Sequence, residues 1–164
     1  MKTLLLLRHA KSSQDCNGVR DFDRPLNQRG LKAAPSIGRL IGKRKLQPDL
    51  VLSSPAERAR QTTQLVFEAA GLKTEVRYDE RIYEATAARL FEIVGQVEED
   101  ANVAMLVGHN PGLEELLAAL TGAAHSMPTS ALACIELDIE KWNKVRAGAG
   151  RLEWLVKPQK LKAR

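Results

Sequence analysis

Short apolar runs alternate with segments of helical periodicity from the first residue to about residue 122, and this alternation limits the possible folds more than any other feature. The runs Thr3 to Leu7, Asp49 to Leu52 and Val103 to Val107 are nearly continuous, as expected for strands covered on both faces. Thr74 to Arg77 is a weaker strand candidate. This pattern predicts an α/β fold with a mostly parallel sheet and helices on both of its faces.

Helical spacing of apolar side chains predicts helices over residues 56–70, 90–97 and 113–120. The first and third are followed by Gly71 and Gly122, a common way to end a helix. The segment from Asn27 to Lys45 is also predicted to be helical. We expect a kink or a late start there, because Pro35 has no N–H to donate.

The pattern changes after residue 130. Ala131 to Leu137 and Arg151 to Val156 resemble strands, and the turn region Gly148-Ala149-Gly150 joins them without a long helix. A hairpin with an antiparallel edge strand is the simplest interpretation, which brings the sheet to about six strands.

Size and composition indicate a single domain over residues 1–164, since 44% of the residues are apolar and 27% are charged. The net charge of +5 comes mostly from a basic tail at residues 157–164. Without its four basic residues the chain has 21 basic and 20 acidic side chains, a net charge of +1. This balance and the aromatic content of 4% argue against nucleic acid as a partner.

The N-terminal apolar run is too short for a secretory signal, and no stretch approaches the ~20 apolar residues of a membrane span. Cys16 and Cys134 lie far apart and form no C-x-x-C motif, so neither a disulfide framework nor a thiolate zinc site is expected. We therefore expect a cytoplasmic protein without a membrane partner, and the sequence is compatible with a monomer.

Residues suited to holding a phosphate follow three of the predicted strands. Because ligands of open α/β sheets bind at the carboxyl ends of the strands, these residues are expected at one edge. They are Arg8-His9, the segment from Ser53 to Arg58, and the segment from Gly108 to Gly112. Each motif alone is common in structural roles, but their joint placement favours one anion site.

Two of these segments also look like helix starts. Ser54-Pro55-Ala56-Glu57 has the form of a capping box with proline at the first helical position. Asn110-Pro111 is similarly interpreted as an N-cap followed by the first helical residue. Both helix starts would direct backbone N–H groups at the same anion.

Four sequence blocks in order resemble the histidine phosphatase superfamily, and within it the SixA-like branch of phosphohistidine phosphatases. The blocks are Leu7 to Ser13, Asp23 to Gly30, Ser53 to Thr62, and Val107 to Gly112. The resemblance covers roughly residues 3 to 156. It implies a three-layer α/β/α sandwich of the phosphoglycerate mutase type, a histidine nucleophile, and neither a metal nor another cofactor.

The resemblance also implies roles for individual residues. His9 would attack phosphorus to give a transient phosphohistidine, which water then hydrolyses to inorganic phosphate. Arg8, Arg58 and His109 would bind the phosphoryl oxygens in place of a metal ion.

Further residues are expected around this centre. Glu80 is the first candidate for the proton donor and Glu84 the second, with a solvated acidic loop as the alternative. Ser12, Arg24 and Asn110 are candidate substrate contacts, although an ordinary turn with Asp23 and Arg24 paired on the surface is equally compatible. His125 is expected to be structural, and the three histidines lack the spacing of a metal site.

The expected substrate is a phosphorylated protein carrying phosphohistidine, which would place the enzyme in protein dephosphorylation and signal transduction. A phosphomonoesterase or mutase acting on a small phosphate ester is the alternative, and a noncatalytic phosphate-binding module is a third hypothesis. Cys16 and Arg20 are too close for a cysteine phosphatase loop. Asp21-Phe22-Asp23 does not follow a strand as an aspartate nucleophile would.

Overall fold

Six strands form one sheet in the computed structural model of the chain, which describes residues 1–14 and 17–158. In chain order the strands are β1 (Lys2–Arg8), β2 (Leu50–Ser53), β3 (Val76–Tyr78), β4 (Val103–Gly108), β5 (Leu132–Leu137) and β6 (Gly150–Val156). The helices within the described ranges are α1 (Gln28–Lys43), α2 (Glu57–Ala70), α3 (Ala87–Gly95) and α4 (Gly112–Thr121), with short 3-10 helices η1 (Asp21–Asp23), η2 (Glu80–Ile82) and η3 (Trp142–Lys144). Each predicted strand and helix is present.

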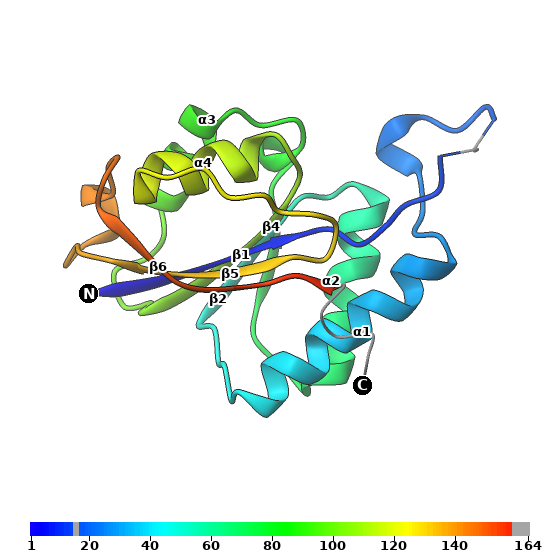
Figure 1. Ribbon diagram of the computed structural model, residues 1–164, viewed down its shortest axis with the longest axis horizontal. Coiled ribbons are helices and arrows are strands. Elements are labelled where there is room, and N and C mark those ends of the chain that lie inside the picture. Colours follow the sequence, from blue (N-terminus) through cyan, green and yellow to red (C-terminus); the bar gives the residue numbers. More distant parts are fainter. Residues whose placement is uncertain (15–16, 159–164) are drawn as a thin grey trace.

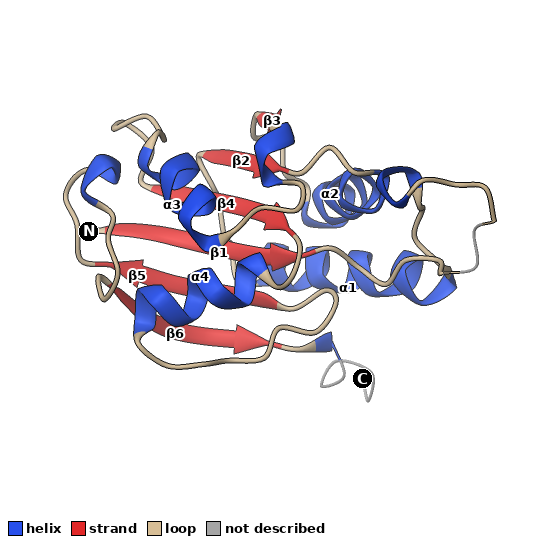
Figure 2. Ribbon diagram, turned by 90° about the horizontal axis from the view of Figure 1, so that it is seen from above, coloured by secondary structure: helices blue, strands red, loops and turns tan. Residues whose placement is uncertain are grey.

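The strand order is β3-β2-β4-β1-β5-β6, with β1 and β4 in the middle of the sheet (Figure 2). The first four strands of the chain are mutually parallel, β5 runs antiparallel to β1, and β6 runs antiparallel to β5. The antiparallel pair thus closes one edge, as predicted. Its connection spans residues 138–149 and includes η3, so it is longer than a tight hairpin turn.

Helices cover both faces of the sheet (Figure 1), with α3 and α4 above it and α1 and α2 below. β1 shows why its apolar run is continuous. Leu4 and Leu6 pack into the core beneath α3 and α4, whereas Leu5 and Leu7 pack into the core formed with α1 and α2. Alternate side chains of a strand point to opposite faces, so a strand buried on both sides needs an apolar residue at every position. The α/β/α sandwich is confirmed.

Of the two alternatives predicted for the first helix, a kink or a late start, the late start is wrong. α1 begins at Gln28, where the side chain of Asn27 accepts a hydrogen bond from the Gly30 amide, and it continues through Pro35. Proline inside a helix costs about 3 kcal/mol, while each fully buried aliphatic side chain contributes about 1.5–3 kcal/mol. Burial of Ile37 and Ile41 on the same helix therefore outweighs the lost hydrogen bond.

Three loops that carry the candidate residues leave the sheet side by side. β4 lies between β1 and β2, with Arg8 opposite Gly108 and Ser53 opposite Val107. All three strands are parallel, so the residues that follow them meet at one edge, as the sequence predicts. No helix within the described residues has the length and apolar character needed to cross a bilayer.

Candidate active site

His9 directly follows β1 and is 6% exposed. Its Nδ1 lies 2.8 Å from the carbonyl oxygen of Ala10, and since a carbonyl can only accept, Nδ1 carries the proton. Nε2 is therefore unprotonated, and its lone pair accepts a hydrogen bond from Arg58 Nε at 3.4 Å. Burial, aided by the charges of Arg58 and Arg8, lowers the pKa of His9 to about 4, although the bond to Ala10 acts in the opposite direction. The ring is neutral at pH 7.

Main-chain contacts hold His9 in place. Its N–H donates to the Gly108 carbonyl on β4 at 3.1 Å, and its carbonyl accepts from the Ser130 amide at 3.1 Å. The next amide, that of Ala10, donates to the buried hydroxyl of Thr62 on α2 at 2.9 Å. A strand, a helix and a loop thus position the imidazole.

His109 follows β4, and its ring centroid lies 5.0 Å from that of His9. Its Nε2 is 2.7 Å from the Ser54 hydroxyl, while its buried Nδ1 has no hydrogen-bond partner among the described residues. Burial lowers the pKa of His109 to about 3, and the adjacent His9 and Arg58 contribute in the same direction. Two neutral imidazoles therefore lie side by side, with their ring planes tilted by 53°.

The two helices begin later than predicted. α2 begins at Glu57 with Ala56 at the N-cap, and the Ser54 hydroxyl both accepts a hydrogen bond from the Ala56 amide at 3.2 Å and contacts His109. α4 begins at Gly112 with Pro111 at the N-cap. The side-chain amide of Asn110 donates to the Met127 carbonyl at 2.9 Å. Both side chains make tertiary hydrogen bonds within the site, which a local motif does not reveal.

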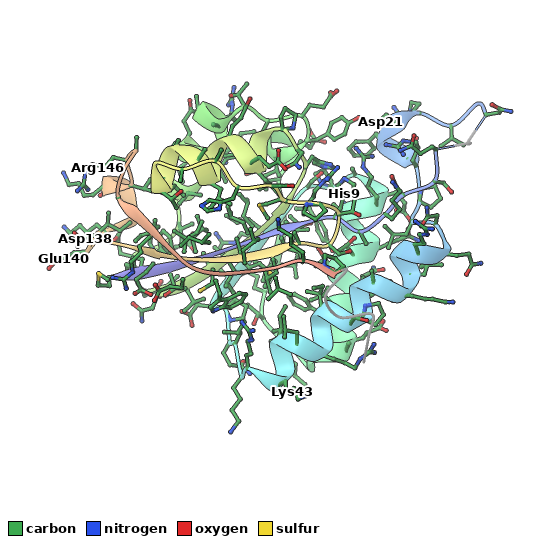
Figure 3. The ribbon with its side chains drawn as sticks, viewed as in Figure 1. His9, Asp21, Lys43, Asp138, Glu140 and Arg146 are labelled. Atoms are coloured by element: carbon green, nitrogen blue, oxygen red, sulfur yellow. The ribbon has the colours of Figure 1, made fainter. Side chains whose placement is uncertain are left out.

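Arg58 projects from the first turn of α2 and is 6% exposed. Besides its contact with His9, its Nη1 donates to the Asp21 carbonyl at 2.7 Å and its Nη2 to the Asp21 carboxylate at 3.1 Å. The Tyr83 hydroxyl donates to the same carboxylate at 2.6 Å. These hydrogen bonds bring η1 over the site (Figure 3), with Asp21 on the side of the molecule where His9 lies.

Asp21 and Tyr83 have complementary protonation states. Hydrogen bonds from Tyr83 and Arg24, together with the charge of Arg58, hold the pKa of Asp21 well below its usual range. Partial burial and the bond to Asp21 raise the pKa of Tyr83 to about 12. At pH 7 the carboxylate is ionised and the phenol is protonated.

Arg8 lies at the end of β1 and is half-buried. Its Nη1 donates to the Met127 carbonyl at 3.1 Å, the acceptor that Asn110 also uses. Its buried Nε has no partner among the described residues. Its charge is close enough to lower the pKa of both His9 and His109.

Arg24 connects η1 to the loop after β1. It donates to the Ser12 hydroxyl at 2.8 Å and to the Asp21 carboxylate at 2.8 and 3.0 Å. The alternative of a surface pair between Asp23 and Arg24 is wrong, because Asp23 pairs with Arg20 and Arg24 pairs with Asp21. Ser12 and Arg24 therefore support the loop that contacts Arg58.

The two predicted proton donors lie outside this network. Glu80 is exposed in η2 and lines a pocket of about 480 Å³ together with Arg77 and Arg81. Glu84 is also exposed. Within the described part of the chain, neither carboxylate forms a hydrogen bond or ion pair with the histidines or with Arg58. The assignment of Glu80 as a proton donor stays a prediction.

Two residues of the site were missed by the sequence analysis. Asp21 contacts Arg58 across 37 positions, and Tyr83 contacts Asp21 across 62. No local pattern marks either residue. His125 takes no part in the network described above, and residues 1–14 and 17–158 hold no cluster of three side chains suited to a metal ion. Cys16 lies outside the described residues, as do positions 159–164 of the basic tail.

Residues 4–98 match the model of the histidine phosphatase superfamily (branch 1), which is more than half of the chain. The chain belongs to this superfamily. An uncharacterized chloroplast protein of Arabidopsis thaliana is 32% identical over 96% of this chain and 78% of the relative. An uncharacterized protein of Mycobacterium tuberculosis is 32% identical over 89% of this chain and 96% of the relative.

Solved structures of the superfamily share the fold. A candidate SixA phosphohistidine phosphatase from Agrobacterium tumefaciens is 34% identical, with a TM-score of 0.84 over 96% of this chain and 98% of that one. The protein histidine phosphatase SixA in complex with tungstate is 25% identical, with a TM-score of 0.79 over 97% and 99% of the two chains. Membership of the superfamily and these structures together support a phosphatase activity.

Proposed function

We propose that this protein is a metal-independent phosphatase that removes phosphoryl groups from phosphohistidine in proteins, with His9 as the nucleophile. The observation that carries the proposal is the state of His9. It is buried and neutral, its Nδ1 proton is bound by a carbonyl, and its Nε2 lone pair faces a guanidinium. The likeness to SixA structures supports phosphohistidine as the substrate class.

In the proposed first step, the Nε2 lone pair forms a bond to phosphorus while the bond to the leaving group breaks. The electron pair of the broken bond goes to the leaving group. The ring of His9 becomes cationic, and the Ala10 carbonyl that accepts Nδ1–H stabilises this charge. Water then attacks phosphorus, which restores the neutral ring and releases inorganic phosphate.

Positive groups surround the position where the phosphoryl oxygens would lie. Arg58 and Arg8 supply fixed charge, and His109 can donate from a ring nitrogen that lacks a partner among the described residues. Charge that develops on the phosphoryl oxygens is most effectively stabilised by groups already in place and shielded from water.

The protonation states favour an imidazole leaving group over an alkoxide. An alkoxide needs a proton from the enzyme, whereas the leaving nitrogen of phosphohistidine is much less basic. Asp21 is the carboxylate that touches Arg58, and at pH 7 it holds no proton to give. Small phosphate esters remain the alternative substrates.

Replacement of His9 by Ala tests the nucleophile. Turnover of p-nitrophenyl phosphate should fall at least about a thousandfold, because removal of a nucleophile from a cooperating set eliminates the covalent route. Wild-type protein incubated with labelled phosphohistidine substrate and quenched in alkali should carry label on His9. The His125→Ala variant changes a histidine outside the site and should keep full activity. Undiminished turnover by His9→Ala would refute the assignment.

The substrate class is tested separately. Wild-type protein should hydrolyse a protein phosphorylated on histidine with phosphoramidate more efficiently than any member of a panel of sugar phosphates. Turnover should persist in the presence of a chelator. A strong preference for one sugar phosphate would replace the phosphohistidine proposal by the small-molecule alternative.

A further inference from the structure

A second pocket lies immediately beside the proposed phosphoryl site. It has a volume of about 360 Å³, and its lining includes Arg8, Lys11 and Arg29 but no acidic residue. The pocket of about 480 Å³ at Glu80 differs, because acidic and basic side chains line it together. The pocket beside Arg8 therefore favours negatively charged groups.

The basic side chains of this pocket are not neutralised within the described part of the chain. Lys11 and Arg29 are exposed, and neither forms a side-chain hydrogen bond or an ion pair there. The backbone keeps them adjacent, because the Asn27 amide donates to the Lys11 carbonyl at 3.0 Å just before α1 begins. A Cβ on Gly30 would collide with that same carbonyl, so the first turn of α1 lies directly on this segment.

Two buried polar groups on the pocket wall also lack partners. The Ser130 hydroxyl belongs to a residue that is 1% exposed and has no hydrogen-bond partner among the described residues. The same holds for Arg8 Nε. A buried polar group without a partner costs about 1–3 kcal/mol, so the wall of this pocket carries an energetic penalty.

The backbone connects the pocket to the nucleophile. The Ser130 amide donates to the carbonyls of both Arg8 and His9. Adjacent Cα atoms are about 3.8 Å apart, so the pocket begins one residue from the ring that would be phosphorylated. One ligand can therefore reach both sites.

We infer that this pocket binds a Glu or Asp side chain of the phosphorylated protein, next to the phosphohistidine. The inference rests on the proposed function. Three positive side chains match a carboxylate, and the apolar walls at Ala33, Pro128 and Pro158 suit the methylene stem that carries it. The volume exceeds what a single inorganic anion fills. The pocket thus favours phosphorylated proteins that carry Glu or Asp next to the phosphohistidine.

The experiment uses two histidine-phosphorylated peptides that differ only in carrying Glu or Gln on both sides of the phosphohistidine. Wild-type protein should hydrolyse the Glu peptide with a kcat/KM about tenfold higher. The Lys11→Gln/Arg29→Gln variant should lose most of this preference. The Arg39→Gln/Lys43→Gln variant should retain it, because these residues lie farther along α1, with Lys43 at its far end (Figure 3). All three proteins should turn over p-nitrophenyl phosphate equally.

Equal turnover of both peptides by the wild type, or a preference unchanged in Lys11→Gln/Arg29→Gln, would overturn the inference. A preference for a small bisphosphate over its monophosphate, lost in that variant, would assign the pocket to a second phosphate and also overturn it. If p-nitrophenyl phosphate is turned over but neither peptide is, the phosphohistidine proposal fails. In that case, the unphosphorylated peptides are tested as inhibitors of p-nitrophenyl phosphate hydrolysis. Inhibition by the Glu peptide alone, lost in Lys11→Gln/Arg29→Gln, supports a carboxylate site in this pocket. Absence of inhibition overturns it.

Discussion

At the scale of single residues, Arg58 has two partners that compete for it. Its Nε points at His9, while Nη1 and Nη2 are held by the carbonyl and carboxylate of Asp21. In the proposed reaction, a phosphoryl group bound at His9 needs this guanidinium. The negative charge of Asp21 therefore opposes anion binding, although the Asp21 side chain is half exposed and solvent screens part of its effect.

The Asp21→Asn variant removes that charge and keeps the shape of the side chain. We expect the competitive inhibition constant of inorganic phosphate to decrease two- to fivefold, because solvent around the half-exposed Asp21 carboxylate limits the strength of this ion pair to about 1 kcal/mol. Inhibition of p-nitrophenyl phosphate hydrolysis at constant pH gives the value. Asp23→Asn is the control, since Asp23 pairs with Arg20 and not with Arg58. Weaker phosphate binding in Asp21→Asn would show that the carboxylate serves mainly to hold Arg58 in position.

At the scale of elements, α1 and α2 pack unusually closely at Gly38. A Cβ built there would lie 2.5 Å from the Val66 carbonyl oxygen and 2.7 Å from the Ala69 Cβ. One turn later, at Gly42, the nearest atoms of Ala70 would be 3.5 and 3.6 Å away, which is ordinary contact. Glycine is thus required at the first position and not at the second.

These two glycines give a matched pair of variants. Gly38→Ala should destabilise the protein by roughly 1–3 kcal/mol, because the helices must separate, and this outweighs the ~1 kcal/mol gained from helix propensity. Gly42→Ala should be neutral or stabilising by up to ~1 kcal/mol. Urea denaturation followed by circular dichroism measures both. Equal effects of the two variants would contradict the close approach at Gly38.

The elements also show how far the sequence alone could lead. The strands and their shared edge were predictable because burial on both faces demands continuous apolar runs such as Thr3 to Leu7. The contact of the Ser54 hydroxyl with His109, 55 positions away, was not predictable, because no local motif encodes it. Asp21 and Tyr83 were missed for the same reason, since only the folded chain brings them to Arg58.

At the scale of the whole molecule, two buried neutral histidines make stability depend on pH. Their pKa values fall from 6.5 to about 4 for His9 and about 3 for His109. The unfolded chain therefore binds more protons than the folded one below pH 6.5, and stability declines as the pH falls through this window. The carboxylate of Asp21, whose pKa is also lowered, affects stability only below its ordinary pKa of 3.8.

We expect the free energy of unfolding of the wild type to decrease by about 3 kcal/mol for each histidine between pH 7 and pH 4, as an upper value. The His9→Asn/His109→Asn variant should show a much flatter dependence over the same range. Urea titrations at pH 7, 5.5 and 4 provide the comparison. Parallel pH profiles for the two proteins would mean that other groups cause the loss.

The main-chain anchoring of His9 has a consequence for how such a protein can diversify. Its amide and carbonyl bind β4 and the Ser130 loop, and the following amide binds α2, so the position of the imidazole ring does not depend on side chains at the rim of the site. Lysines and arginines around the opening can then be exchanged without moving the ring. A protein with this fold can therefore change the substrates that it admits by substitutions at the opening, while the geometry around His9 stays the same.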